Sequence, residues 1–138
     1  MVNVMLIGLP GSGKSTLAAK YVAEGYTLVS TDAARAAIGG DPAVQHPWPE
    51  VWAVCLALAK GADKVVYDAT NILPEHRQDV MRQIGGKWIG VVVDTPLDEC
   101  LRRNAARDRV VPEEVIRNMH SKYVPPSLDE GFIQLIRT

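Results

Sequence analysis

The segment from Gly8 to Thr16, GLPGSGKST, most constrains what this chain can fold into. It fits the pattern G-x-x-x-x-G-K-[ST] without a mismatch, and it directly follows the apolar run 2–7. In such a loop the glycines let backbone N–H groups turn inward around an oligophosphate. An ordinary Gly-, Pro- and Ser-rich turn is the alternative. The complete motif after an apolar run favours a nucleoside triphosphate site, and residues 8–16 are called the phosphate loop below.

Each position of the phosphate loop has an expected part in holding the nucleotide. Lys14 is expected to reach the β- and γ-phosphates, and the Ser15 hydroxyl is expected to bind Mg²⁺. A helix that begins near Lys14 would direct its positive dipole end at the same phosphates. The residues expected to contact the nucleotide are Gly8, Pro10, Gly11, Ser12, Gly13, Lys14, Ser15 and Thr16.

Apolar runs and helical patterns alternate along the chain. Strands are predicted at 2–7, 27–30, 64–68, 87–94 and 132–136. Helices are predicted at 14–24, 32–38, 50–60, 74–84, 96–107 and 112–123. The proline-containing stretch before residue 50, which includes Trp48, is interpreted as a loop that could face a substrate. Strands alternating with helices imply crossover connections, so we expect an α/β fold with a parallel sheet and helices on both faces.

The composition is that of one ordinary globular domain. The chain has 138 residues, 47% of them hydrophobic, and a formal net charge of −1. This charge argues against a protein that grips long nucleic acids through their backbones, but a local basic pocket for a short end stays open. Cys55 and Cys100 lack metal-ligand spacing and are expected to be buried thiols. No signal peptide or membrane span is recognised, so a cytoplasmic protein without membrane contact is expected.

The hexapeptide STDAAR at 30–35 follows the second predicted strand. Ligands in such sheets bind beyond the carboxyl ends of the strands, which is where Asp32 would lie. Arg35 comes three residues later, so both side chains share one helix face. The Asp32 carboxylate could accept a proton from an attacking hydroxyl, and Arg35 could hold a phosphate of the acceptor. Alternatively, Asp32 caps its helix and pairs locally with Arg35.

Two further segments carry candidate functional residues. Asp68 ends the third predicted strand, where an acid commonly accompanies the phosphate-loop serine and Mg²⁺. A turn in which Thr70 or Asn71 caps the next helix is the alternative.

The stretch 101–112 contains four arginines, and Arg103 and Arg107 share a helix face. We interpret it as a lid that neutralises charge on the transferred phosphoryl group, although a solvated basic helix end is also consistent.

The ordered segments GLPGSGKST, STDAAR, VVYDATNILPEHR and RRNAARDRVVPEEVI resemble those of the P-loop polynucleotide 5′-hydroxyl kinase family, the kinase modules of nucleic-acid end-healing enzymes. The resemblance covers about residues 2–124. It implies a P-loop kinase-like three-layer αβα domain over 1–138, with a five-stranded, mainly parallel sheet and an arginine-bearing lid at about 103–112. It also implies ATP and Mg²⁺. The chain departs from the family in one respect: the last expected strand lies at its end, so the phosphatase and ligase modules that often accompany such kinases are not expected.

The resemblance assigns roles to matching positions. Lys14 and Ser15 would serve the ATP phosphates and Mg²⁺, and Asp32 would be the general base for the 5′-hydroxyl. Arg35 would contact the acceptor phosphate, Asp68 matches the acid after the third strand, and Arg103 and Arg107 match lid arginines. The favoured acceptor is therefore the 5′-OH end of DNA or RNA.

Other functions remain open at this stage. A guanine-reading motif of the Asn/Thr-Lys-x-Asp type is not visible, which weakens a GTPase interpretation. The three histidines are scattered and suggest no metal site. Relatives of this kinase fold phosphorylate nucleosides, sugar acids or antibiotics, so a small-molecule kinase is the nearer rival. A module that senses ATP without transferring phosphate is the more remote one.

Overall fold

A five-stranded sheet forms the centre of the computed structural model, which describes residues 2–39, 48–107 and 110–138. The strands are β1 (Val2–Ile7), β2 (Thr27–Ser30), β3 (Val65–Asp68), β4 (Lys87–Val92) and β5 (Gln134–Arg137). Their order is β2-β3-β1-β4-β5, and every neighbouring pair is parallel. The α/β expectation is confirmed. The sheet is parallel throughout because a helix intervenes in every connection between successive strands.

Six α-helices and one short 3-10 helix make up the rest of the regular structure that is described. They are α1 (Lys14–Ala23), α2 (Thr31–Ile38), α3 (Trp48–Lys60), α4 (Pro74–Ile84), α5 (Leu97–Ala105), α6 (Glu113–Lys122) and η1 (Leu128–Glu130). The predicted loop was expected to continue through Pro49, and this was wrong because α3 already begins at Trp48. Trp48 and Pro49 form the first turn of α3, where a proline loses no helical hydrogen bond. Residues 40–47 of that predicted loop lie outside the described part of the chain.

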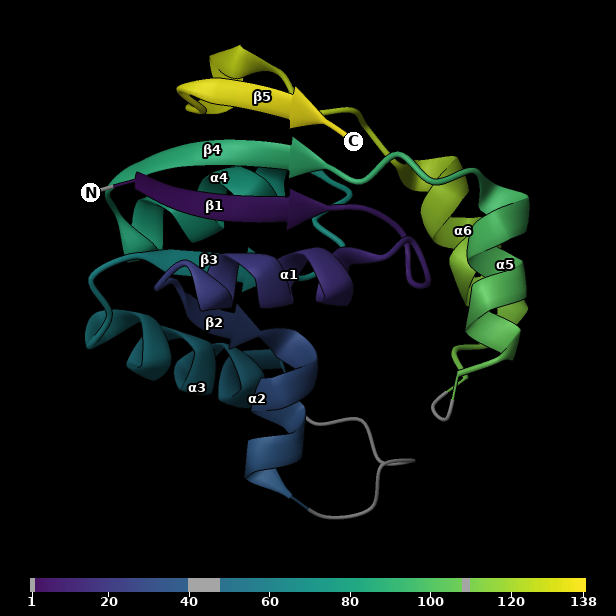
Figure 1. Ribbon diagram of the computed structural model, residues 1–138, viewed down its shortest axis with the longest axis horizontal. Helices are drawn as coiled ribbons and strands as arrows, with labels where there is room; N and C mark the ends of the chain where they lie inside the picture. The colour runs from purple at the N-terminus through teal and green to yellow at the C-terminus, as the bar shows by residue number, and fades with distance from the viewer. Residues whose placement is uncertain (1, 40–47, 108–109) are drawn as a thin grey trace.

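The sheet is covered on both faces, which gives the three layers (Figure 1). On one face Val4, Leu6 and Val66 pack against Ala18 of α1. The other face, which includes Tyr67, packs against residues of α2, α3 and α4. The inner strands β1 and β3 are buried on both sides, which explains why they appear in the sequence as continuous apolar runs rather than alternating ones.

Helices α5 and α6 lie side by side beyond the carboxyl ends of β1 and β4 (Figure 1). A buried cluster of Leu9, Cys100 and Ile116 joins them to the phosphate loop. Because the strands are parallel, the segments that follow β1, β2 and β3 all emerge at this same edge of the sheet. No helix in the described ranges is both long and apolar enough to cross a membrane.

Candidate active site

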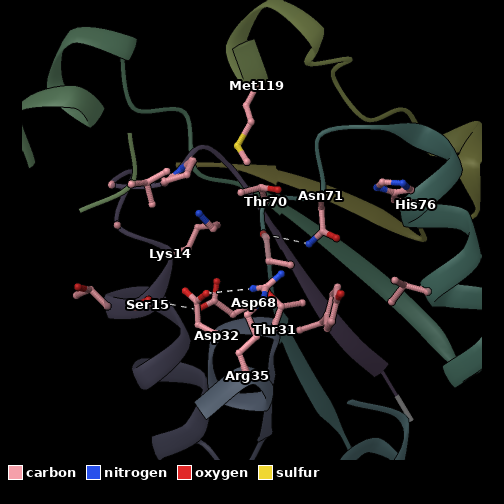
Figure 2. Close-up of a pocket in the computed structure, with 18 of the residues that line it drawn as sticks. Lys14, Ser15, Thr31, Asp32, Arg35, Asp68, Thr70, Asn71, His76 and Met119 are labelled. Carbon is pink, nitrogen blue, oxygen red and sulfur yellow. Dashed lines mark hydrogen bonds and ion pairs between the residues drawn. The ribbon is translucent and has the colours of Figure 1, made fainter. Parts of the chain in front are cut away.

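A cavity of about 780 Å³ opens at the carboxyl edge of the sheet. Its walls come from the phosphate loop, from α2 and α3, from the segment after β3, and from the end of α5. Figure 2 shows side chains from several of these segments converging on it. The candidate residues that line it are Pro10, Gly11, Gly13, Lys14, Ser15, Thr16, Asp32, Arg35, Asp68, Arg103 and Arg107. The remaining two candidates, Gly8 and Ser12, do not line the cavity.

The phosphate loop depends on its glycines for shape. Gly11 and Gly13 have φ angles of 82° and 105°, in the left-handed region that disfavours other residues. A Cβ on Gly11 would also lie 2.5 Å from the carbonyl oxygen of Cys100 in α5. The hydroxyl of Ser12 is buried with no hydrogen-bond partner among the described residues. The loop is therefore built by close backbone packing against α5, as well as by its own turn.

Lys14 is held inside the phosphate loop. Its Nζ donates a hydrogen bond to the carbonyl of Leu9 at 2.8 Å, and the side chain is buried. Burial lowers the pKa of Lys14 to about 8, and the negative charges of Asp68 and Asp32 counteract part of that fall. The ammonium group thus lies at the floor of the cavity.

Ser15 and Asp68 meet across the cavity floor (Figure 2), where the Ser15 hydroxyl donates to Asp68 Oδ2 at 3.3 Å. Burial raises the pKa of Asp68, although Lys14 and the Ser15 hydrogen bond oppose this. The described residues contain no cluster of three or more His, Cys, Asp or Glu suited to a metal. A hydroxyl beside one carboxylate nevertheless fits Mg²⁺, which is usually held by one or two carboxylates together with substrate phosphates.

The alternative for Asp68, a turn in which Thr70 or Asn71 caps the next helix, does not match the structure. The residue at the N-cap of α4 is Leu73, and no side chain caps that end. Asn71 instead has a positive φ of 52° and is buried. Its amide donates to the carbonyl of Leu6 at 2.7 Å, so it ties the segment after β3 to the end of β1.

Asp32 and Arg35 lie on α2 at the side of the cavity. Ser30, and not Asp32, caps this helix, because its hydroxyl accepts the N–H of Ala33 at 3.2 Å. Asp32 Oδ1 accepts a hydrogen bond from Arg35 Nη1 at 3.3 Å. The Asp32 carboxylate is near enough to raise the pKa of Lys14 and of Asp68, although burial is the larger influence on both. Asp32 therefore pairs locally with Arg35 and also lines the cavity, so these two expectations are compatible.

The two arginines expected in the lid both border the cavity. Arg103 donates to the carbonyl of Ser12 at 3.2 Å and to Glu99 at 3.0 Å, so it touches the phosphate loop directly. Arg107 is exposed and follows the end of α5. Arg102 pairs with Glu99 and does not line the cavity. Residues 108–109, which include Arg109 and part of the expected lid, lie outside the described residues.

Sequence reasoning missed a set of buried polar residues behind the site. The side chain of Arg77 is fully buried and binds both carboxylate oxygens of Glu130 at 2.7 and 3.0 Å. Its third hydrogen bond goes to the carbonyl of Asn71 at 2.8 Å. Asn104, also buried, bonds both the N–H and the carbonyl of Val111. The only available signal was an arginine or asparagine in an apolar helical pattern, which does not identify a distant partner.

The phosphate loop after the central strand of a parallel sheet, with helices on both faces, defines the class of the protein: it has a P-loop kinase-like α/β fold. Residues 4–126 match the model of the AAA_33 family, described as an AAA domain, and the chain belongs to that family. The three-layer P-loop kinase-like fold expected from the sequence is confirmed.

Similar proteins include kinases that act on different acceptors. The chain is 28% identical to an L-seryl-tRNA(Sec) kinase of Methanococcus maripaludis, over 89% of this chain and 52% of that protein. It therefore spans about half the length of the curated relative that it matches.

Solved structures of the same fold are similarly varied. A gluconokinase from Sinorhizobium meliloti 1021 superposes with a TM-score of 0.69 at 21% identity, covering 98% of this chain and 80% of that one. A chain of the Pnkp1/Rnl/Hen1 RNA repair complex gives 0.71 at 20%, covering 88% and 43%. Kti12 of Chaetomium thermophilum in complex with ADP-AlF3 gives 0.70 at 17%, covering 99% and 88%. At these identities the likeness shows the fold alone.

Proposed function

We propose that this protein transfers the γ-phosphoryl group of ATP to the 5′-hydroxyl end of DNA or RNA. The observation that carries the proposal is the Asp32–Arg35 pair, which borders the same cavity as Lys14 and Ser15. A carboxylate and a guanidinium side by side can engage a hydroxyl and a phosphate carried by the same sugar of one acceptor. A 5′-terminal nucleotide that is joined to the next one presents both groups.

In the proposed reaction, Asp32 accepts the proton of the 5′-hydroxyl as its oxygen attacks the γ-phosphorus of ATP. The bond between that phosphorus and the oxygen bridging it to the β-phosphate breaks, and ADP leaves with the electron pair. Lys14, Arg103 and Arg107 neutralise the charge on the phosphoryl oxygens. Arg35 holds the phosphate on the 3′ side of the attacking nucleotide, which positions the hydroxyl.

The remaining candidates serve the ATP molecule and its metal. Backbone N–H groups of the phosphate loop would surround the phosphates, and Ser15 and Asp68 would hold Mg²⁺. Mg²⁺ held there would offset the negative charge of the phosphate groups. In this proposal residues 1–138 act as one kinase domain, with a lid at about 103–112.

A small-molecule kinase is the second candidate. A cavity of about 780 Å³ falls in the size range of small-ligand sites. One of the structural neighbours is a gluconokinase, which shows that the same fold accommodates such a reaction. An acceptor of this kind would carry no phosphate beside its reacting hydroxyl, so Arg35 would be dispensable.

The test combines an acceptor panel with a variant. The protein, labelled ATP and Mg²⁺ are incubated with 5′-OH DNA, 5′-OH RNA, nucleosides and gluconate. We expect transfer to the polynucleotides, and a fall in kcat of about 10²–10⁴-fold for Asp32→Asn, which keeps the size of the side chain but loses the base. Glu24→Gln, the same change at an exposed site outside the cavity, serves as the control.

Two results would contradict the proposal. Transfer to a metabolite with none to any polynucleotide would assign the protein to the second candidate. Full activity of Asp32→Asn on polynucleotides would show that Asp32 does not accept the proton of the 5′-hydroxyl.

A further inference from the structure

Three aromatic side chains form one wall of the cavity. The rings of Trp48 and Trp52, on the first turns of α3, stack with centroids 6.0 Å apart and planes inclined by 16°. Trp52 meets Tyr67 of β3 edge to face, with centroids 6.0 Å apart and planes at 84°. All three residues line the cavity. We call Trp48, Trp52 and Tyr67 the aromatic wall.

The inner part of the aromatic wall is fixed and the outer part is open. Tyr67 and Trp52 are 1% and 9% exposed, and the indole N–H of Trp52 donates to Gln83 Oε1 at 2.8 Å. Trp48 is the outermost ring of the same stack, and it is 51% exposed. A large apolar ring half exposed to water gains free energy when another apolar plane covers it. The stack is therefore a rigid support that presents one ring toward the cavity.

The aromatic wall lies beside the residues proposed to bind the acceptor. Helices α2 and α3 pack against each other, and Arg35 of α2 lines the same cavity as Trp48 of α3. Burial raises the pKa of the Tyr67 hydroxyl, and the positive charge of Arg35 partly opposes that rise, as expected for a guanidinium near this ring. An acceptor whose phosphate is bound to Arg35 would extend its adjacent groups along the wall.

We propose that Trp48 stacks on a nucleobase of the acceptor, next to the groups that Asp32 and Arg35 engage. The inference rests on the proposed function and makes its substrate class narrower: the acceptor must carry a planar aromatic base near the reacting hydroxyl. The wall offers ring faces, and the indole N–H of Trp52 is already bonded to Gln83. Such a surface suits a base, whereas a polyhydroxylated sugar acid needs several hydrogen-bonding groups.

The direct test compares two acceptor oligonucleotides that differ only at the 5′-terminal nucleotide, one intact and one lacking its base. We expect the wild-type protein to have a KM about tenfold or more lower for the intact oligonucleotide, with a similar kcat. Trp48→Ala should raise the KM of the intact acceptor to that of the abasic one, while Trp48→Phe should keep most of the difference. Leu58→Ala, which removes another exposed apolar side chain of α3 away from the cavity, is the matched control.

A binding measurement without ATP makes the inference independent of turnover. Stacking should quench the fluorescence of Trp48 when the intact oligonucleotide is added, and Trp48→Phe should remove most of that quenching. Equal KM values for intact and abasic acceptors would overturn the inference and leave the proposed function standing. Quenching that depends on the base, without transfer to any oligonucleotide, would support the inference and overturn the proposed function. Absence of both transfer and quenching would overturn both.

Discussion

Lys14 has two competing requirements. It must carry a positive charge to bind phosphate, yet the loop that positions it also buries it, and burial lowers its pKa to about 8. Its ammonium group donates a hydrogen bond to the carbonyl of Leu9. An entering phosphate would provide a stronger, charged partner for the same group.

This environment predicts how ATP binding depends on pH. Only the protonated lysine attracts phosphate, so the affinity should be constant below the pKa of about 8 and should fall as the pH rises through it. The Kd should then increase by up to about tenfold for each further pH unit. Calorimetric titrations with ATP between pH 6.5 and 9.5 would measure this. A Kd that stays level to pH 9.5 would show that Lys14 does not carry the binding charge.

At the scale of secondary structure, α5 is the element that links the phosphate loop to the expected lid. Gly11 packs under the carbonyl of Cys100, and Arg103 donates to the carbonyl of Ser12. Asn104, in the last turn of α5, bonds both backbone groups of Val111 at 2.6 and 3.0 Å. These two bonds fix the separation between the last turn of α5 and Val111, which lies two residues before α6. Arg107 thus belongs to a connection whose two ends are held together by hydrogen bonds.

Replacing Asn104 by alanine should loosen this connection. Two backbone groups of Val111 would lose their partners, at a cost of about 1–3 kcal/mol for each one left unsatisfied. Because Arg107, in the connection after α5, would be less well positioned, we expect kcat to fall by about tenfold to a hundredfold. Turnover and thermal unfolding of Asn104→Ala can be compared with Asn118→Ala, an exposed asparagine on α6. Unchanged turnover in a destabilised variant would show that the hydrogen bonds between Asn104 and Val111 stabilise the fold without affecting catalysis.

Most elements were predictable from the sequence because their signals are local. Apolar runs ending in Gly, Asp or Ser located the strands, and every predicted helix exists. The start of α3 was missed because Pro49 was taken as a loop signal, whereas a proline in a first helical turn is compatible with the helix. The short helix at Leu128–Glu130 was missed because three residues are too few for a periodic pattern.

Across the whole molecule, a buried ion pair connects the site to the far end of the chain. Arg77 of α4 joins Glu130 of η1 to the carbonyl of Asn71, and Asn71 holds the segment that follows Asp68. In addition, the N–H of Val124 donates to the carbonyl of Ile72 at 2.9 Å. The loop that follows Asp68 is therefore supported by residues more than 50 positions away in the sequence.

Arg77→Met should consequently destabilise the protein by about 3–5 kcal/mol, because it leaves the carboxylate of Glu130 buried without its partner. Arg82→Met, five residues along the same helix, removes an exposed arginine paired with Asp79 and should cost about 0–1 kcal/mol. Urea unfolding of both variants measures the difference. Similar losses in the two variants would mean that the buried pair contributes no more than a surface pair.

The candidate site could be predicted from the sequence where its residues belong to local motifs, and not where they depend on contacts between distant segments. Lys14, Ser15, Asp32, Arg35 and Asp68 each belong to a short motif at a strand end, and parallel strands bring such ends together. Arg77 and Glu130 are 53 residues apart, and Trp52 meets Tyr67 across a helix–sheet contact. No local pattern identifies which distant segments will touch, so these partners became visible only in the fold.

The order of the strands has an evolutionary consequence. The phosphate loop follows β1 at the centre of the sheet, whereas the segment proposed to select the acceptor, 31–52, follows β2 at its edge. Under the proposed function, mutations in that one contiguous stretch that keep Asp32 would alter which molecule is phosphorylated without changing a residue of the phosphate loop. Exchange of this stretch between related proteins would then be a route to new specificities.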